Sequence, residues 1–577
     1  MAEWVGARAL LADQGRSQAE AGAISWDLAS RTGRGLYNST KTAFAPRFAI
    51  AYSPQFTDGF LGKVFGDPGK TVIRAGAGIF YDVFGQSMMN RFASSALGFS
   101  TTISNPSGSL NAATAPRITG LNGLPSSLIP DAPPGGFPQL QPDSFQITNA
   151  IDDSIVPPYS IPLNFSVSRE FGRGFLVEVG YVGRLSRRTL VQSDLAMPTN
   201  LRDPSSGQTY FEAANVLADH VAAGTPLGQV SAVPFWENLW PGAAGTGLVS
   251  GTEGLTATQG VYDLFQVIAP DYTGVINLLD TACVPSCSTL GPNAMFNAQY
   301  ASLAAWRSLG SASYHSGQFT LRKYFSDGVQ FDLNYTLGKS IDLASFPENS
   351  QSFAGLIINT WAPEQMRAVS EYDMLHQFNG HFVAELPFGR GQRFGGDFGP
   401  VTNALFGGWQ LSGIYRQTSG LPARVGNGRQ WPTNWNIFGF ATPKGEIPTE
   451  TGTFKNAPSV VGDGGPNIFA DPASALEAFE PTRPGQSGVR NPIRGDGYFN
   501  MDLGISKNFV MPWEGHSLQF RCEIFNVMNS TRFDPGLESL DNEVSISLDL
   551  TNSGSFGKYS QTLTNPRSMA FVLRYTF

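Results

Sequence analysis

The chain has 577 residues, with 38 Lys and Arg against 46 Asp and Glu, a formal net charge of −8. Charged residues make up only 15% of it, where a soluble domain carries about 25%. The acidic balance disfavours a nucleic-acid binder. A hydrophobic share of 41% excludes wholesale disorder, and three cysteines cannot hold a disulfide-rich fold together. No run approaches the roughly 18 apolar residues of a membrane-spanning helix. A charge-poor all-β protein remains.

Alternation of hydrophobic and polar residues with period two is the main pattern, and it puts one side-chain class on each face of a strand. Residues 1–36 are left unassigned, as a loop or, at 24–28, a strand remnant. Eleven strands follow in chain order, at residues 44–52, 71–81, 163–167, 175–184, 314–325, 329–337, 378–386, 409–415, 499–505, 516–524 and 568–577. Several are about ten residues long, enough for a tilted strand to cross a bilayer.

Connection lengths separate a soluble sandwich from a membrane barrel. Short or moderate connections alternate strictly with long ones, which run over 82–158, 185–313, 340–375, 418–497 and 529–567. Compact domains rarely contain such long loops. Outer-membrane barrels have short periplasmic turns and long outer loops. We therefore predict an antiparallel transmembrane β-barrel with long extracellular loops rather than a soluble sandwich.

Several phrases in the sequence resemble the TonB-dependent outer-membrane receptors, specifically the Oar-like group. They are 44–48 (FAPRF) with 52–54 (YSP), 74–81 (RAGAGIFY), 386–391 (LPFGRG), 407–413 (GGWQLSG), 521–529 (RCEIFNVMN) and 565–567 (NPR). The resemblance implies a 22-stranded barrel closed by an N-terminal plug that contacts TonB. The terminal alternation of Phe571, Leu573, Tyr575 and Phe577 resembles the signal read by the barrel-insertion machinery.

The chain departs from that pattern ahead of its first strand. We find no plug, no TonB box, no carboxypeptidase-regulatory-like domain and no signal peptide there. If Phe577 ends in the periplasm, the first and eleventh strands both run inward, as strands 12 and 22 of a 22-stranded barrel do. We therefore expect residues 37–577 to be the C-terminal part of a receptor barrel, about 11 of a probable 22 strands.

The partners implied are outer-membrane lipid, the insertion machinery, and the missing plug and N-terminal barrel half. TonB would act only through that plug, on uptake of a small-molecule, glycan or peptide ligand that the sequence does not identify. The alternative is a self-contained structural or adhesive outer-membrane protein, or a passive porin.

Catalytic chemistry finds no support in the motifs. None of the five histidines forms a His-Glu-x-x-His pair, and no phosphate-binding loop is complete. We expect no enzyme activity, metal site or cofactor.

Aromatic residues in the long connections are the candidate ligand contacts. Six of the ten tryptophans lie there: Trp236, Trp240, Trp306, Trp361, Trp431 and Trp435. Exposed rings can stack on flat ligands, but packing of the loops against one another is the alternative. Cys283 and Cys287 lie in the longest connection, where a small disulfide ring is favoured over free thiols or a metal site.

Overall fold

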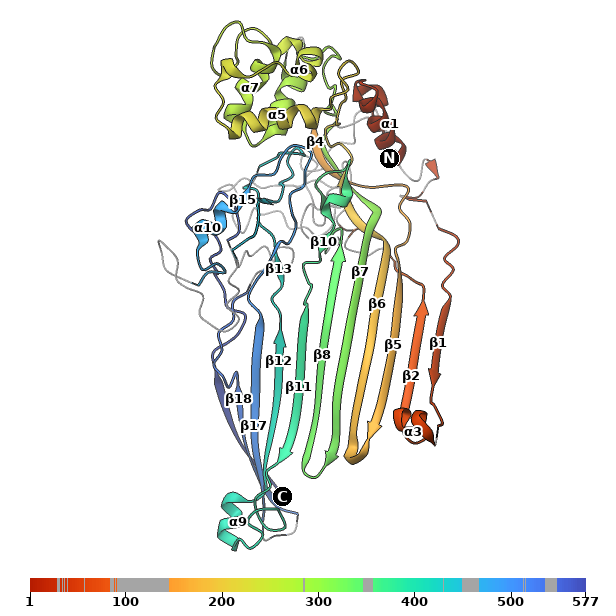
Figure 1. Cartoon of the computed structure of the whole chain (residues 1–577), viewed down its shortest axis with the longest axis vertical. Coiled ribbons are helices and arrows are strands. Elements are labelled where there is room, and N and C mark those ends of the chain that lie inside the picture. Colours follow the sequence, from red (N-terminus) through yellow and green to blue (C-terminus); the bar gives the residue numbers. More distant parts are fainter. Residues whose placement is uncertain are drawn as a thin grey trace, which may run out of the picture.

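The computed structural model describes residues 1–577 except 28–31, 34, 36, 39, 57, 84–87, 89, 91–144, 284–285, 346–355, 429, 449–465, 512, 514 and 535–546. One large sheet dominates it, and its long strands stand side by side in Figure 1. No helix of the described ranges has the length and apolar character needed to cross a membrane.

Eleven strands form the main path of the sheet, each hydrogen-bonded to the next, and all eleven predicted strands are confirmed. They are β1 (Arg47–Tyr52), β2 (Thr71–Gly78), β5 (Tyr159–Phe171), β6 (Phe175–Asp194), β7 (Tyr300–Ser326), β8 (Val329–Asp342), β11 (His376–Glu385), β12 (Trp409–Thr418), β17 (Tyr498–Val510), β18 (Ser517–Phe525) and β19 (Ser568–Thr576). All ten neighbouring pairs are antiparallel.

Short strands extend the sheet or join the connections. β3 (Phe80–Tyr81), β4 (Gln146–Ile151), β9 (Leu356–Ile357) and β10 (Ala368–Val369) attach to the main sheet, while β13 (Pro422–Ala423) pairs with β16 (Ile493–Arg494) and β14 (Thr442–Pro443) with β15 (Phe479–Glu480). The helices are α1 (Ala2–Asp13), α3 (Gly59–Phe65), α5 (Tyr210–Ala222), α6 (Pro234–Leu239), α7 (Ala257–Ile268), α8 (Tyr272–Asn277), α9 (Pro400–Phe406) and α10 (Pro472–Glu477).

Register carries the alternation of the sequence into two chemically distinct faces. Asp332 of β8 pairs with Arg322 of β7, and the next row on that face joins Asn334 to Thr320. One residue along, Phe331 lies opposite Phe382 of β11. Because successive side chains point to opposite sides, one face is polar and the other apolar.

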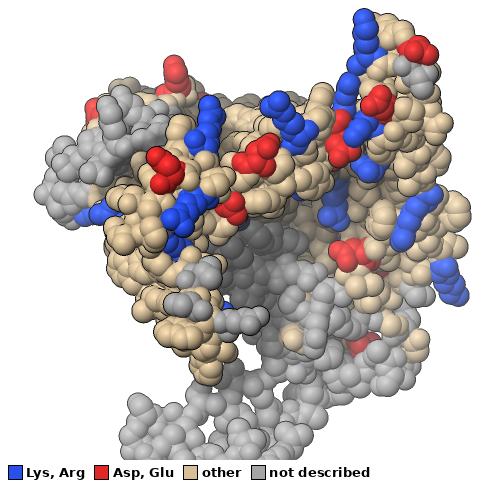
Figure 2. Space-filling model, turned by 90° about the horizontal axis from the view of Figure 1, so that it is seen from below, with Lys and Arg blue, Asp and Glu red and all other residues tan. Residues whose placement is uncertain are grey.

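The two ends of the sheet differ, as the connection lengths predict. Turns of a few residues join β5 to β6, β7 to β8 and β17 to β18, while α3 and α9 sit in the two moderate connections. All of these lie at one end, here called the turn end, with the C-terminus (Figure 1). The long connections gather at the opposite end, here called the loop end. Viewed from the turn end, the molecule curves around a hollow, with charged side chains along its rim (Figure 2).

The structure corrects three expectations about the segments outside the main strands. β6 continues to Asp194 and β7 begins at Tyr300, so the connection predicted as 185–313 is 195–299 and contains α5–α8. Within 82–158, β4 pairs in parallel with the extension of β7. Residues 1–36 contain α1, and residues 24–27 form no strand; α1 lies at the loop end (Figure 1). No hydrophobic periodicity predicts this helix, because tertiary contacts of its buried Arg8, described below, hold it in place.

Candidate functional site: the loop end of the sheet

A cavity of about 470 Å³ opens on the polar face of β6, β7 and β8 near the loop end. Register builds it in rows. Arg184, Tyr314 and Ser340 lie side by side across the three strands, and the next row on the same face ends at Asp342. Tyr372, from the connection after β8, adds a second aromatic ring. The lining therefore combines one cation, the carboxylates of Asp82 and Asp342, hydroxyls and aromatic rings.

Arg184 is the cation of this cavity. Its Nη2 donates to Ser160 Oγ at 3.1 Å. A guanidinium has five donors in a planar fork, so further donors remain for carboxylate, phosphate or sugar oxygens. The site could hold a polar or anionic ligand.

Buried ion pairs fix the long connections to the rim of the sheet. Arg490 pairs with Asp342, and both side chains are 3% exposed. Arg494 pairs with Asp373, whose side chain is 1% exposed, while the arginine side chain is 28% exposed. Arg307 of β7 pairs with Asp152 at 2.9 Å, and Arg532 pairs with Asp496 of another long connection at 3.4 Å. A buried charge is tolerated only when it is paired, so these contacts hold the loops in defined positions.

The connection between β6 and β7 folds into a helical module with its own hydrophobic core, here called the loop module (195–299). Capping boxes begin two of its helices, at Thr209 with Glu212 and at Thr256 with Gln259. The core includes Trp236 and Phe265, whose rings lie 6.3 Å apart. The module stands above the strands at the loop end (Figure 1).

The six loop tryptophans divide by burial. Trp236, Trp240 and Trp306 are at most 1% exposed. Their rings cannot reach a ligand in solvent, so the ligand-contact hypothesis does not hold for these three, and the packing alternative describes them. Loop burial of this kind requires contacts between segments distant in sequence, which no local pattern reveals.

The other three tryptophans are only partly buried. Trp431 and Trp435 lie together, with ring centroids 4.8 Å apart, against the loop module. Trp361 lies apart from them, 5.7 Å from the guanidinium of Arg8 and hydrogen-bonded to the Pro198 carbonyl oxygen at 2.8 Å. Ligand contact by these three stays a prediction.

Arg8 is fully buried and fixes α1 to the loop end. Its guanidinium donates to the carbonyl oxygens of Leu195 and Met197 and to Gln18 Oε1. Burial lowers the pKa of Arg8 to about 10, and Asp194 partly opposes that shift. The N-terminal segment is thereby part of the loop end.

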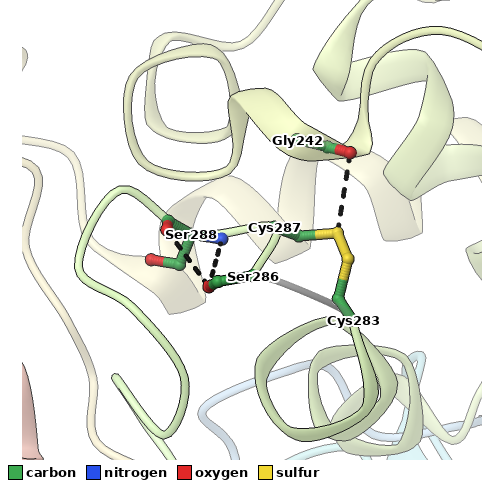
Figure 3. The surroundings of a disulfide bond; sticks show 5 residues. All are labelled: Gly242, Cys283, Ser286, Cys287 and Ser288. Atoms are coloured by element: carbon green, nitrogen blue, oxygen red, sulfur yellow. Dashed lines mark hydrogen bonds between the residues drawn. A yellow bond between two sulfur atoms is a disulfide. The ribbon is translucent and has the colours of Figure 1, made fainter.

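A disulfide joins Cys283 and Cys287 in the loop module (Figure 3). The Gly242 N–H donates to the carbonyl oxygen of Cys287 at 3.1 Å. Cys287 Sγ lies 3.6 Å from the Gly242 carbonyl oxygen. The cystine ring therefore contacts the turn that follows α6.

The buried carboxylate of Asp280 binds backbone groups within the same module. Its carboxylate accepts the backbone N–H groups of Ala294, Met295 and Phe296 at 2.8–2.9 Å. Burial nevertheless raises the pKa of Asp280 to about 6. The folded module therefore binds this proton more tightly than the unfolded chain, whose aspartates have a pKa of about 3.9.

The stability of the loop module should consequently depend on pH. The contribution of Asp280 to the free energy of unfolding is largest below pH 4 and falls by about 3 kcal/mol as pH rises through 6. Asp280→Asn removes this dependence. Thermal unfolding of both proteins, followed by tryptophan fluorescence between pH 4 and 7, gives the difference; wild type gaining stability relative to the variant over that interval would contradict the assignment.

The C-terminal residues lie on the apolar face of the last strand. Phe571, Leu573 and Tyr575 are opposite Cys522, Phe520 and Leu518 of β18. Phe577, beyond the strand end, is 89% exposed. Their function as an insertion signal stays a prediction. Within the described part of the chain, no group of three or more His, Cys, Asp or Glu is placed to hold a metal ion.

Sequence reasoning missed the cavity and the buried arginine pairs. The residues of the cavity come from three strands and from connections far apart along the chain. Arg490 and Arg494 lie close together in a charge-poor connection, which suggests ion pairs there. Their spacing does not identify the carboxylates with which they pair.

Comparison with known proteins places the chain in a family. The family model described as outer membrane beta barrel domain matches residues 8–570. A search of curated proteins gives no match.

Solved structures that match part of their length to this chain include the outer membrane transporter YddB from Escherichia coli, at 8% identity and a TM-score of 0.37, and the siderophore receptor PirA from Acinetobacter baumannii, at 8% and 0.34. Each similarity covers 92% of this chain, but only 40% of YddB and 41% of PirA. The chain thus spans about two fifths of their length. Because the family match covers nearly the whole sequence, the chain belongs to the outer membrane beta barrel domain family, and its location is the bacterial outer membrane.

Proposed function

We propose that this chain is the C-terminal part of the barrel of a TonB-dependent outer-membrane receptor of the Oar-like group, and that its loop end captures the ligand. Two observations support the proposal: the sequence phrases that resemble this group, and the strand count of the sheet. The strand count is the stronger of the two, because it follows from topology.

An antiparallel sheet with an odd number of strands has edge strands that run in the same direction. β1 and β19 are the first and last of eleven, and neither is paired with the other among the described strands. Closing the sheet by itself, or with a second copy, would require a parallel seam between them. An odd number of additional strands gives an antiparallel seam on both sides, as eleven further strands of a 22-stranded barrel would.

Ligand capture is assigned to the cavity beneath the long connections. Arg184 with Tyr314 and Tyr372 suits a small molecule, glycan or peptide that carries carboxylate, phosphate or hydroxyl groups. The ion pairs that hold the long connections in place support a preformed site, which reduces the entropy cost of ordering the loops on binding. The plug and TonB would supply the driving force, so this chain alone should bind but not transport.

The test is assembly of the chain in an outer membrane. Residues 1–577, exported with an outer-membrane targeting signal, are compared alone and together with a polypeptide that supplies an N-terminal eleven-stranded barrel half. We expect a heat-modifiable, protease-resistant species only in the second case. A heat-modifiable, conducting species formed by the chain alone would overturn the proposal and favour a passive porin.

Deletion of Phe577 tests the proposed insertion signal. We expect several-fold less chain in the outer membrane, because the exposed terminal ring is the proposed contact with the insertion machinery. Immunoblots of membrane fractions measure it. Leu248→Ser, which changes another exposed apolar side chain, 73% exposed in the loop module, serves as the control and should leave assembly unchanged. Equal loss in both variants would contradict the signal.

A surface-binding or adhesive role is the second candidate, favoured by the loop module. A packed helical core with a disulfide at the outer end is more than a short barrel loop requires. Removing residues 203–292 while leaving the strands intact separates the two. Loss of cell-surface attachment with unchanged ligand binding at the cavity would favour adhesion.

A further inference from the structure

Two short helices at the turn end expose apolar side chains to their surroundings. In α3, Phe60 is 78% exposed and Leu61 and Val64 are also exposed. In α9, Val401 is 74% exposed, with Leu405 and Phe406 exposed beside it. The helices occupy the two moderate connections, β1–β2 and β11–β12, and lie beyond the strand ends (Figure 1).

The side chains that hold the end of α9, here called its seat, lie on the apolar face of the sheet. Lys507 pairs with Trp409 in the register of β17 and β12, and with Phe520 of β18. Its Nζ donates to the Gly407 carbonyl oxygen and lies 3.4 Å from that of Asn403. Trp409 Nε1 donates to the Leu405 carbonyl oxygen at 2.8 Å. The last turn of α9 is therefore held by side chains of the face that meets lipid.

The seat of α3 also lies on the apolar face, near the β1 edge of the sheet, and has the same arrangement. Arg169, which pairs with Thr71, lies on the face of β5 that carries Val167 and Phe165. Its guanidinium donates to the carbonyl oxygens of Lys63, at 3.2 Å, and Val64. Thr71 Oγ1 donates to the carbonyl oxygen of Phe65, the last residue of the helix.

In both seats a cation of the apolar face binds the carboxyl-terminal carbonyls of a turn helix. The interaction also has the favourable sign for a helix dipole. Aromatic rings flank both cations, with Phe171 5.0 Å from the Arg169 guanidinium and the Trp409 ring 5.3 Å from Lys507 Nζ. A charge beside hydrocarbon is costly unless it is bonded, and the helix carbonyls provide those bonds.

We propose that α3 and α9 lie in the interfacial layer of the periplasmic leaflet, with their apolar side chains at the edge of the acyl chains and phospholipid as the occupant of this surface. Continuity supports it: the seats belong to the lipid-facing side of the wall, so the exposed apolar residues extend that surface beyond the strands. Charge supports it too. Lys63 and Arg393 are exposed in these connections and can meet lipid phosphate, as basic residues of interfacial helices do.

Depth measurement by spin labelling tests the proposal on residues 1–577 assembled with an N-terminal barrel half in outer-membrane vesicles. A Cys522→Ser background removes the free cysteine, while the disulfide remains closed without reductant. Nitroxides are placed by Leu405→Cys and Phe60→Cys. The matched control in the same connection as α9 is Gln392→Cys, which is exposed. A strand control, Phe165→Cys, reports insertion of the sheet.

We expect labels at 405 and 60 to be more accessible to oxygen than to a water-soluble nickel complex, and the label at 392 to show the reverse. Lys507→Gln should shift the label at 405 toward the nickel complex without changing the label at 165, because α9 loses its seat. A label at 405 that is accessible mainly to nickel, while 165 reports lipid, would overturn the proposal. A label at 405 shielded from both reagents would also overturn it and identify a protein partner there. Failure at 165 would instead count against the barrel itself.

Discussion

Replacing Arg490 with methionine is expected to destabilise the connection between β12 and β17 by about 3–5 kcal/mol, because Asp342 would be left charged and unpaired in a buried site. Both partners are 3% exposed, so the pair is shielded from bulk water. Arg490 also donates to the Asp342 carbonyl oxygen at 3.1 Å. Hydrogen exchange of the backbone amides in residues 487–494 measures the loss directly.

Two further variants show whether burial is the cause. Arg483→Met removes a pair with Asp219, which is 66% exposed, and should cost about 0–1 kcal/mol. The double variant of Arg490→Met with Asp342→Asn should recover much of the loss, since no unpaired charge remains. An equal effect of the Arg490 and Arg483 variants would show that the pair does not hold the connection in place.

The same pair links loop order to the cavity. Asp342 lines the cavity and ends β8, so a free carboxylate there would place a negative charge in the row next to Arg184. We therefore expect Arg490→Met to alter binding of anionic probes as well as loop exchange. The buried Arg490–Asp342 pair therefore has two consequences: it orders the loops, and it leaves Arg184 free to bind anionic probes.

The strands were predictable from sequence because their signal is local. In β8, each odd-numbered residue from Val329 to Leu337 is apolar and the residues between them are polar or small, and the register confirms that they share a face. A bilayer imposes this alternation on every strand that crosses it. Strand ends were less predictable. β6 and β7 continue past the alternating region because they pair with each other and with β4 and β9, where both faces are covered by loops.

The loop end could not be predicted, for a different physical reason. Its helices are held by contacts between residues distant in sequence, such as those of Arg8 with the carbonyls after β6. Composition does not reveal whether an aromatic residue in a loop packs or binds, as Trp236 and Trp435 illustrate: one is fully buried and the other is not. The disulfide was favoured from spacing and compartment, while its contact with Gly242 depends on how α6 ends.

Truncation of Trp236 to alanine should destabilise the loop module by about 3–5 kcal/mol, as loss of a large buried ring does. The ring is fully buried and packs edge-on against Phe235 and Tyr210, with centroids 4.9 and 6.1 Å away. The sheet should remain assembled, since the module has its own core. Thermal unfolding by near-UV circular dichroism, with protease sensitivity of residues 195–299, measures the effect.

Trp513→Ala is the matched control. This ring is 62% exposed at the turn end, so its loss should change stability by less than about 0.5 kcal/mol. If Trp236→Ala left the module intact but abolished ligand binding, the ring would be a contact residue and the packing assignment would be wrong. If the module unfolded and cavity binding through Arg184 persisted, capture would belong to the sheet, with the module acting separately at the cell surface.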